Sequence, residues 1–448
     1  MRIKQISVSG LFGIFDHIIP LNMEEKITII HSLNGFGKTS ILRMLNGLFN
    51  SQYSVFRDIP FNKFRVEFNN GSCVEVVKNC TIGKAKKSEK ISCDFYEPDL
   101  DKQTVVIMDK EAFLIREPID TSKLLFSLDD VLQLQELESK SKALRYSSNS
   151  ETLSSVDISN LKKMGEKLDE PRWLKKLKSD IHVRLIESQR LLNVVSKRSS
   201  KSPMLPTVST YSDEIAQLIQ SKLAEYGTTS QSLDRTFPAR VVQQNQSSGL
   251  EDKELRLQLD KLEKNRSRLV KLGLLDKLDK DNNSDFQIQS QDHIDPSTIN
   301  VLSVYAQDIE KKLSVFSEIA NKIELLRKII NSKFAYSYKE MNFNKKKGFV
   351  FKTLSTSWIE NISAKDLSSG EQHELVLFYE LLFKVEPNSL VLIDEPELSL
   401  HVAWQAQFLR DLQEIIKLTD LDVLLATHSP DIIQDRWDLT KELKGLAR

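Results

Sequence analysis

Apolar and polar positions follow two different patterns along the chain, and strand patterns occupy both of its ends. Residues 64–68 and 73–77 alternate apolar and polar side chains around Asn69-Asn70-Gly71, which predicts a β-hairpin. Short apolar runs without alternation are typical of buried strands. Such alternating or continuous runs predict strands at residues 3–8, 27–30, 349–352, 390–393 and 423–426.

The middle of the chain is helical in pattern. Glycine becomes scarce after about residue 120, and apolar residues then recur at helical spacing. This pattern predicts helices at 121–144, 158–168 and 172–195, with polar breaks at 199–210 and 227–249. Leucines seven residues apart after residue 251 favour a helical hairpin or short coiled coil over 251–334, although one helical bundle packed on the core domain fits nearly as well.

The order of these patterns predicts one α/β domain that is split by a long insertion. Residues 1–119 would form its first half, residues 120–335 the helical insertion, and residues 336–448 its second half. This arrangement explains strands at both ends more simply than three separate domains do.

Composition narrows the class of protein. The 448 residues include 63 basic and 63 acidic side chains, so the net charge of zero gives no global argument for nucleic-acid binding. No apolar run approaches 18 residues, and the N-terminus reads as a strand, so we expect a cytoplasmic protein without a membrane span or signal peptide. Cys73, Cys80 and Cys93 lack the spacing of a zinc site and are expected to be reduced thiols.

A phosphate-binding loop is the first candidate for chemistry. An Ile-rich strand leads into a glycine-bearing loop, then Gly-Lys-Thr, then a helix predicted at 39–49. Backbone N–H groups of such a loop cradle phosphates, Lys38 would reach the β/γ-phosphates, and the Thr39 hydroxyl would bind Mg²⁺. Ser32 stands where the motif has its first glycine, so an ordinary strand–turn–helix remains the alternative. The nucleotide-binding residues predicted here are Asn34, Gly35, Phe36, Gly37, Lys38, Thr39 and Ser40.

Two further buried strands end in chemistry-bearing residues. Residues 390–393 lead into Asp394-Glu395-Pro396, and residues 423–426 lead into Thr427-His428. Carboxylates at the carboxyl end of a buried strand lie at the sheet edge where ligands bind. Asp394 fits a Mg²⁺ carboxylate and Glu395 the base that polarises the attacking water. His428 is placed to contact the γ-phosphate or that water; alone, a strand-end histidine is more often structural.

Residues 367–372, Leu-Ser-Ser-Gly-Glu-Gln, precede an amphipathic helix. Ser and Gly at a helix start supply a hydroxyl and free N–H groups, which can bind an anion or simply cap the helix.

Together these motifs resemble the ABC-type ATPase head of SMC, RecF and OLD-like proteins, in the order P-loop, insertion, signature, Asp-Glu-Pro and His switch. The resemblance implies ATP and Mg²⁺ as ligands and a head dimer in which the signature closes over ATP held by the other subunit. Residues 398–401 match the family's D-loop, and Gln103 is a weak candidate for its Q-loop. By this resemblance the signature acting in trans comprises Ser368, Ser369, Gly370 and Glu371.

The stretches Asp-Glu-Pro-Glu-Leu-Ser-Leu-His and Thr-His-Ser-Pro-Asp-Ile-Ile resemble OLD-like ATPases of bacterial antiphage defence. Stand-alone members resemble AriA of PARIS first, which works with a TOPRIM nuclease, and PtuA of Septu second, which works with an HNH nuclease. Only 20 residues follow His428, so we expect the nuclease on a separate chain. The resemblance implies a slow ATPase that senses a phage protein and oligomerises to hold and release its effector.

A DNA-clamping or repair ATPase of the RecF/SMC kind is the alternative. Residues 160–201 carry twelve Lys/Arg against five Asp/Glu, a net charge of +7. A solvated helical face explains such a run better than DNA binding does, because charge runs usually are solvated. A transporter subunit fits worst, because the insertion between P-loop and signature is too long.

Overall fold

The computed structural model describes residues 1–82, 87–98, 102–107, 124–125, 170–187, 192–193, 205–243, 252–276, 295–354 and 361–445. The chain forms two compact units, Met1–Ser188 with Val385–Arg448, and Gln189–Lys384. These boundaries differ from the predicted domain limits, because strand β9 (Val183–Ile186) pairs with β15 (Leu390–Asp394) in the first unit. The predicted helices at 121–144 and 158–168 lie outside the described residues.

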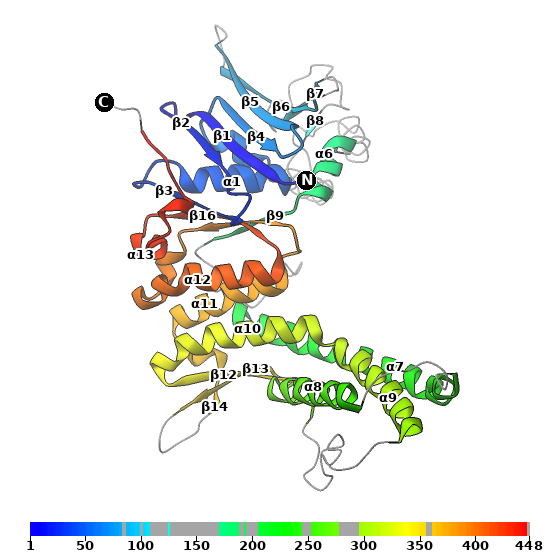
Figure 1. The fold of residues 1–448 in the computed structure, drawn as a ribbon. Coiled ribbons are helices and arrows are strands. Elements are labelled where there is room, and N and C mark those ends of the chain that lie inside the picture. The colour runs from blue at the N-terminus through cyan, green and yellow to red at the C-terminus, as the bar shows by residue number, and fades with distance from the viewer. Residues whose placement is uncertain are drawn as a thin grey trace, which may run out of the picture. The chain divides into compact units, whose positions relative to one another are not determined.

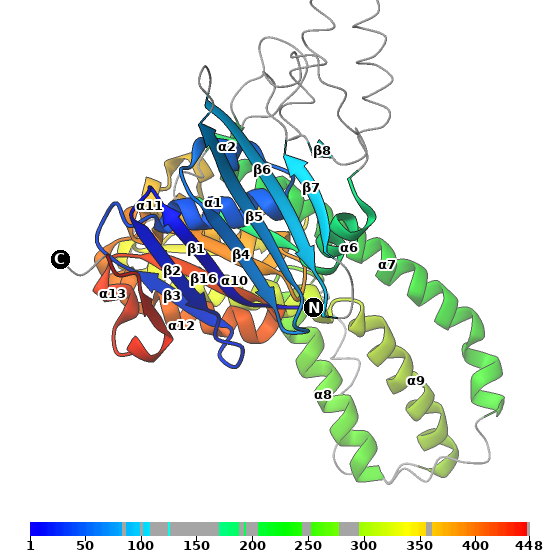
Figure 2. The same ribbon diagram turned by 90° about the horizontal axis from the view of Figure 1, so that it is seen from above.

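A seven-stranded sheet, antiparallel except for its last pair, forms one layer of the first unit (Figures 1 and 2). The hairpin predicted around Asn69-Asn70-Gly71 is confirmed, with Glu67 opposite Cys73. The last pair, β7 with β8, is parallel, so the sheet is mixed. In spatial order its strands are β2 (Phe15–Pro20), β1 (Ile3–Leu11), β4 (Lys63–Phe68), β5 (Cys73–Ile82), β6 (Lys87–Tyr96), β7 (Gln103–Ile107) and β8 (Leu124–Leu125).

A second sheet is parallel throughout and positions the candidate site. Its central strands are nearly continuous apolar runs, as expected for a sheet covered on both faces. The strand order is β17 (Thr440–Glu442), β3 (Ile27–His31), β16 (Asp422–Thr427), β15 and β9. Because the strands are parallel and in register, the carboxyl ends of β3, β16 and β15 meet at one edge.

Helix α1 (Lys38–Phe49) packs its apolar side into a core shared by both sheets. That core contains Leu42 and Leu45 of α1, Phe64 of β4 and Leu392 of β15. Helix α12 (Val402–Thr419) packs on the opposite face of the parallel sheet (Figure 1). The remaining elements of this unit are α2 (Ser54–Asp58), α6 (Arg172–Asp180), α13 (Pro430–Ile433), and 3-10 turns at Pro396–Ser399 and Trp437–Leu439.

The helix predicted over 172–195 is wrong at the described residues after 180, which are 181–187 and 192–193. Helix α6 ends at Asp180, and Val183–Ile186 form β9 instead. The Val-Arg-Leu-Ile stretch satisfies its backbone groups by pairing with β15, and tertiary pairing of this kind overrides a helical apolar spacing.

In the second unit, helix α7 (Thr207–Gln243) continues through residues 227–243 of the break predicted at 227–249, and residues 244–249 lie outside the described residues. Glycine in a helix interior costs about 1 kcal/mol, and Gly227 has open space around it. Ion pairs from Arg240 to Asp308 and from Lys312 to Asp234 (2.7 Å) fasten α7 to α9 (Pro296–Ser314). These contacts explain why the helix continues.

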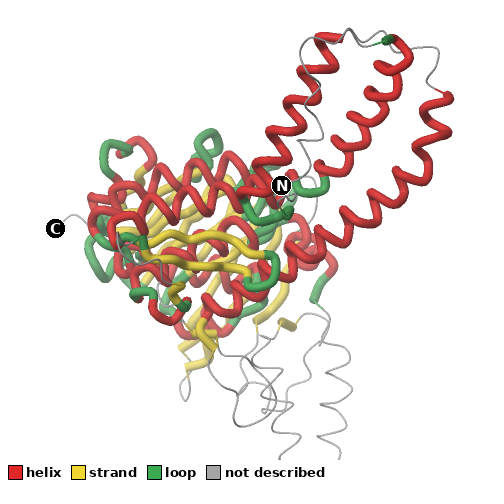
Figure 3. The backbone as a smooth tube through the Cα atoms, turned by 90° about the horizontal axis from the view of Figure 1, so that it is seen from below, coloured by secondary structure: helices red, strands yellow, loops and turns green. Residues whose placement is uncertain are grey.

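Helices of the insertion extend side by side (Figure 3). Helix α9 packs against both α7 and α8 (Asp252–Lys271), so the structure contains more than the predicted two-arm hairpin. The second arm is also divided at Val315 and Phe316, where α9 ends and α10 (Ser317–Phe334) begins.

The second unit continues with a three-stranded antiparallel sheet and helix α11. The Lys333 ammonium of α10 pairs with Glu374 of α11 at 3.2 Å, and both side chains are fully buried. The elements of this part are β10 (Leu192–Asn193), β11 (Leu205–Pro206), β12 (Lys339–Asn344), β13 (Gly348–Thr353), β14 (Asn361–Ile362), α11 (Ser369–Tyr379), a π-helical turn at Glu380–Lys384, and 3-10 turns at Ala335–Ser337 and Ala364–Asp366. The predicted α/β class, with mixed sheets and a long helical segment between its halves, is confirmed.

Candidate nucleotide-binding site

The loop between β3 and α1 adopts the conformation that its glycines permit. Gly35 and Gly37 both have φ of 89°, in the left-handed region that favours glycine. Gly37 is the N-cap residue of α1, and a Cβ there would lie 2.4 Å from Leu11 Cδ2. Asn34 and Gly35 are exposed, so this loop presents its backbone to solvent at the start of a helix.

The structure shows why a serine is tolerated at position 32. Its φ is not positive, so the position does not require the glycine that the motif usually carries. The buried Lys38 side chain folds back on the loop, and its ammonium donates to the carbonyl oxygens of Ser32 (3.0 Å) and Leu33 (3.4 Å). These acceptors hold the lysine beside the loop that it would serve.

A hydrogen bond in the site joins helix α1 to β15. The Thr39 hydroxyl donates to Asp394 Oδ1 at 3.1 Å, although the two residues are 355 positions apart. Burial raises the pKa of Asp394, and the hydrogen bond from Thr39 lowers it by less. A cation bound nearby would therefore stabilise the ionised form of this carboxylate. Ser40 follows on α1 and is half-buried.

Glu395 and His428 follow on the same sheet edge. Glu395 has φ of 43°, a strained value for a side chain of this size, and its amide donates to Ala426 O on β16. This conformation leaves the carboxylate partly exposed. His428 Nδ1 lies 3.7 Å from Glu395 Oε1, so the two residues predicted as catalytic are neighbours.

A residue that the sequence reasoning missed holds the histidine. Glu397 is buried, and its Oε1 accepts from the Thr427 hydroxyl and the His428 amide, both at 2.8 Å. His428 Nδ1 lies 3.1 Å from the same oxygen. Because this carboxylate oxygen lies beside Nδ1, Nε2 is the ring nitrogen that remains for a ligand. The sequence does place acids on both sides of Pro396, but the predicted catalytic role was given to Glu395 and not to Glu397.

Phe36 is fixed from behind by the β1–β2 hairpin. Its carbonyl oxygen lies 3.0 Å from His17 Nε2, and its ring contacts the Phe15 ring at 5.0 Å. Burial lowers the pKa of His17, so this histidine is neutral and donates to the carbonyl. These contacts hold the loop immediately before Gly37.

The predicted signature residues lie in the second unit, at the start of α11. Ser368 caps this helix: its hydroxyl accepts from the Glu371 amide, while the Glu371 carboxylate accepts from the Ser368 amide at 2.8 Å. Burial raises the pKa of Glu371, but donation from Lys339 and Ser337 outweighs it and lowers that pKa. The Glu371 carboxylate is thus occupied within its own subunit. Ser369 is exposed and Gly370 is half-buried.

The positions predicted for the D-loop and the Q-loop lie on a helix start and on a strand. His401 caps α12 by accepting from the Ala403 amide at 3.3 Å, and Leu398 and Val402 beside it are each 62% exposed. Gln103 is exposed on β7 of the antiparallel sheet.

The donor set suits Mg²⁺. A hydroxyl and a carboxylate are hard oxygen ligands, and Mg²⁺ is usually held by one or two of these together with substrate phosphates. Among the described residues, no group of three or more His, Cys, Asp or Glu side chains is arranged to hold a metal by itself. Thr39 and Asp394 therefore fit an ion that arrives with a nucleotide.

In the described helices, no stretch is both long and apolar enough to cross a bilayer.

Comparison with known proteins adds a family. The model of the AAA ATPase domain family AAA_15 matches residues 1–433. Protein ea59 of Escherichia phage lambda is 37% identical over 78 residues, which cover 17% of this chain and only 15% of that protein.

Among solved structures, the Smc head domain with an extended coiled coil from Pyrococcus furiosus aligns over 96% of this chain and 91% of that chain (12% identity, TM-score 0.32). The SMC head domain from Thermotoga maritima aligns over 97% and 92% (10% identity, TM-score 0.34). Because these scores are low, the fold class rests on the strand pairing described above.

Proposed function

Because the chain belongs to the AAA ATPase domain family, we propose that it binds ATP with Mg²⁺ and hydrolyses it at the carboxyl edge of the parallel sheet. The contact between Thr39 and Asp394 carries this proposal. It places a P-loop hydroxyl against a strand-end carboxylate, the pair that holds the nucleotide's magnesium in P-loop ATPases.

The roles follow from the positions of the side chains. The backbone of residues 34–40 would bind the phosphates, and Lys38 would exchange its loop carbonyls for phosphate oxygens. Mg²⁺, when bound by Thr39 and Asp394, supplies positive charge that offsets the charge of the phosphates. Glu395 would orient and deprotonate water. His428, oriented by Glu397, would contact that water or the γ-phosphate through Nε2.

Two substitutions test the hydrolytic site. We expect Glu395→Gln to bind ATP at wild-type strength. Its rate of ATP turnover should fall by at least about 100-fold, because the base is lost. We expect Lys38→Ala to lose ATP binding. Filter binding with labelled ATP and phosphate release measure the two quantities separately. Full turnover by Glu395→Gln would remove the proposed base, and full binding by Lys38→Ala would remove the P-loop assignment.

We further propose that Ser368–Glu371 act on ATP held by a second copy of the chain. The exposed Ser369 is the position to test, because its substitution leaves the Ser368 cap intact. Lys38→Ala and Ser369→Arg should each be inactive alone. In an equal mixture, about half of the dimers would be mixed and would hold one intact composite site, so activity should return to roughly a quarter of wild type. A mixture as inactive as its components would contradict action in trans.

As its biological role, we propose a sensor and scaffold in antiphage defence that oligomerises with ATP to hold a nuclease effector, TOPRIM-type before HNH-type, until a phage protein triggers release. The OLD-like Asp-Glu-Pro-Glu and Thr-His-Ser-Pro stretches support this role. The test is co-purification of the neighbouring nuclease with and without ATP, together with plaque counts for wild type and Lys38→Ala. Equal phage resistance of the two strains would contradict the role.

A DNA clamp is the second candidate, supported by the basic residues between 160 and 201. Lys175 and Lys176 on α6 are exposed, whereas Lys178 is bound to Glu170 at 2.6 Å. We therefore expect a clamp to lose salt-dependent DNA binding in Lys175→Glu/Lys176→Glu. Unchanged DNA affinity in that variant would remove this candidate.

A further inference from the structure

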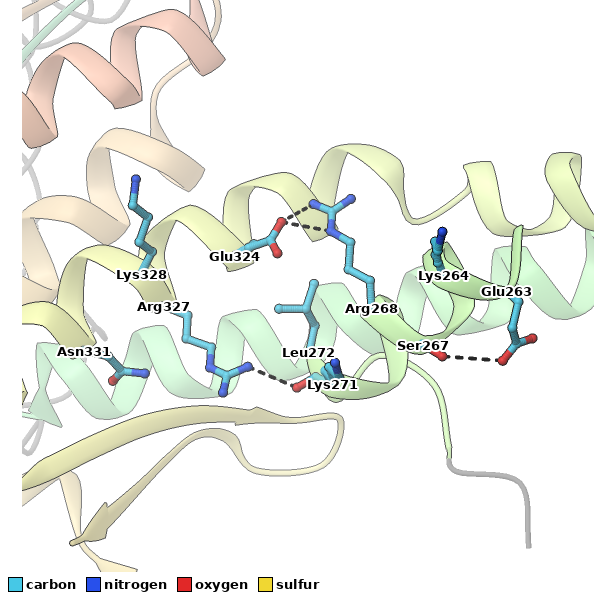
Figure 4. A pocket seen from close by; sticks show the side chains of 10 residues that line it. All are labelled: Glu263, Lys264, Ser267, Arg268, Lys271, Leu272, Glu324, Arg327, Lys328 and Asn331. Carbon is cyan, nitrogen blue, oxygen red and sulfur yellow. Dashed lines mark hydrogen bonds and ion pairs between the residues drawn. The ribbon is translucent and has the colours of Figure 1, made fainter. Parts of the chain in front are cut away.

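The helical insertion carries a groove between α8 and α10 that the proposed ATPase does not use (Figure 4). Its volume is about 590 Å³, within the range of ligand-binding pockets. Side chains from the C-terminal half of α8 form one wall, and side chains of α10 form the other. The lining residues are Glu263, Lys264, Ser267, Arg268, Lys271, Leu272, Glu324, Arg327, Lys328 and Asn331.

Contacts across the groove fix its shape. Arg268 of α8 donates to Glu324 of α10 at 2.9 Å, and Figure 4 shows this pair spanning the two helices. At the other end, the Arg327 guanidinium donates to the carbonyl oxygen of Lys271, the last residue of α8, at 3.2 Å. Leu272 is buried at 3% exposure and closes the floor. Because both walls are joined at two points, the groove is a formed feature of the bundle.

The groove is positively charged in a chain whose net charge is zero. Five cations line it against two carboxylates. The Glu324 carboxylate is bound to Arg268, so it offers little to a ligand. Lys264 is 75% exposed, and among the described residues it pairs only with the exposed Asp260 on its own helix, a weak contact. Lys271 is also exposed, and its ammonium has no hydrogen bond or ion pair to another described residue. Lys264 and Lys271 are therefore the two lining cations that we take as available to an anion.

The mixture of groups in the walls favours a peptide as the anion. Nucleic acid presents a phosphate at every nucleotide, and that regular charge would pass over the Glu263 carboxylate. A peptide concentrates its negative charge on Asp and Glu side chains and brings backbone N–H groups that carboxylates accept. Charge complementarity of this kind selects partners and speeds their encounter.

We propose that this groove binds an acidic segment of a partner protein, in which several Asp or Glu side chains contact Lys264, Lys271 and the neighbouring cations. The segment would lie between α8 and α10. This interaction needs no nucleotide, so it stands or fails apart from the proposed ATPase.

Fluorescence anisotropy of the full chain with a labelled ten-residue peptide of alternating Glu and Ser tests the proposal. We expect saturable binding that weakens about tenfold or more in Lys264→Glu/Lys271→Glu, because attraction becomes repulsion at both positions. Lys261→Glu is the matched control: it is exposed on the same helix, does not line the groove, and should change affinity less than about twofold. Binding should also weaken between about 50 and about 300 mM salt.

A peptide of opposite charge distinguishes binding in this groove from non-specific binding. The Lys264→Glu/Lys271→Glu variant should bind an alternating Lys and Ser peptide more tightly than wild type does. A labelled oligothymidine of ten nucleotides serves as the competing ligand class. The proposal is overturned by an acidic peptide that does not saturate, by equal effects of the double variant and Lys261→Glu, or by oligothymidine that binds more tightly with the same sensitivity to the double substitution.

Discussion

Replacing Glu397 with alanine is the sharpest test of how the site is positioned. In the structure this carboxylate contacts Thr427 and His428, and so holds the strand end that carries His428. Alanine removes the acceptor of two donors, the Thr427 hydroxyl and the His428 amide. The exposed His428 ring also loses the carboxylate oxygen that lies 3.1 Å from Nδ1.

The cost to stability can be worked from these contacts. The hydroxyl of Thr427, which is fully buried, and the amide of His428 each lose a charged acceptor, at about 1–3 kcal/mol for each donor left unsatisfied. The wild type carries an opposing cost, because Glu397 Oε2 is buried without a hydrogen-bond partner among the described residues, and removing it recovers about 1–3 kcal/mol. The net loss should be about 1–3 kcal/mol, so the variant remains folded.

The effect on turnover should be larger than the effect on binding. Partners that orient a functional histidine are typically worth about 10- to 100-fold in activity. We expect kcat for ATP to fall by about that factor while KM changes less than about threefold, since Glu397 does not contact the P-loop. Thr427→Val is the comparison, because it removes one hydrogen bond to Glu397 but keeps the contact with Nδ1. A kcat of Glu397→Ala no lower than that of Thr427→Val would refute the positioning role, as would a change confined to KM. Glu24→Ala, an exposed acid in the same unit, should match wild type.

Three further predictions concern the loop, the carboxylate and the insertion. Gly37→Ala should lower thermal stability by about 1–3 kcal/mol more than Gly35→Ala, because both strain the backbone but only Gly37 lacks room for a Cβ; circular dichroism melts measure the difference. Burial raises the pKa of Asp394, so the folded state holds the Asp394 proton more tightly than the unfolded chain does. The resulting stabilisation is present below about pH 4 and is lost as the pH rises through the pKa of Asp394 in the folded state. Nucleotide-free Asp394→Asn should therefore melt above wild type at pH 8 and close to it at pH 4, and Mg-ATP should no longer raise its Tm; an equal Tm difference at both pH values would refute this. Lys333→Met should cost about 3–5 kcal/mol in urea unfolding by leaving Glu374 buried without its cation, and the double variant with Glu374→Leu should recover most of that loss.

The parts of the fold that the sequence predicts best are those in which local pattern and tertiary environment agree. The run Leu390 to Ile393 is apolar at every position because both faces of its sheet are covered, so its strand and its terminal acids could be placed without a structure. The loop before Lys38 is equally local, since Gly35 and Gly37 mark the positive φ values that it adopts. Ser32 could not be judged in the same way, because only the structure shows that its φ is ordinary.

The errors lie where long-range contacts decide between local alternatives. Gly227 is a helix breaker by propensity, but α7 is held to α9 at Asp234 and at Arg240, and these pairs lie up to 78 residues apart in sequence. Glu397 was missed for a similar reason. Its role is defined by Thr427 and His428, about 30 positions away, and nothing in the sequence says which acid of a pair turns inward.

The basic stretch shows how charge counting fails for the same physical cause. Lys178 adds one charge to the count, yet its ammonium contacts Glu170, Ser51 and Tyr53 at 2.6–2.7 Å. Burial lowers the pKa of Lys178 and the bond to Glu170 raises it by less, so the contacts join α6 to the segment after α1 at an electrostatic cost. Reversing this charge would put a second carboxylate beside Glu170 and destabilise the unit, and lost DNA binding would then report unfolding. Only exposed lysines such as Lys175 and Lys176 can separate the DNA-clamp alternative from the proposed nuclease scaffold, because their reversal leaves the core intact.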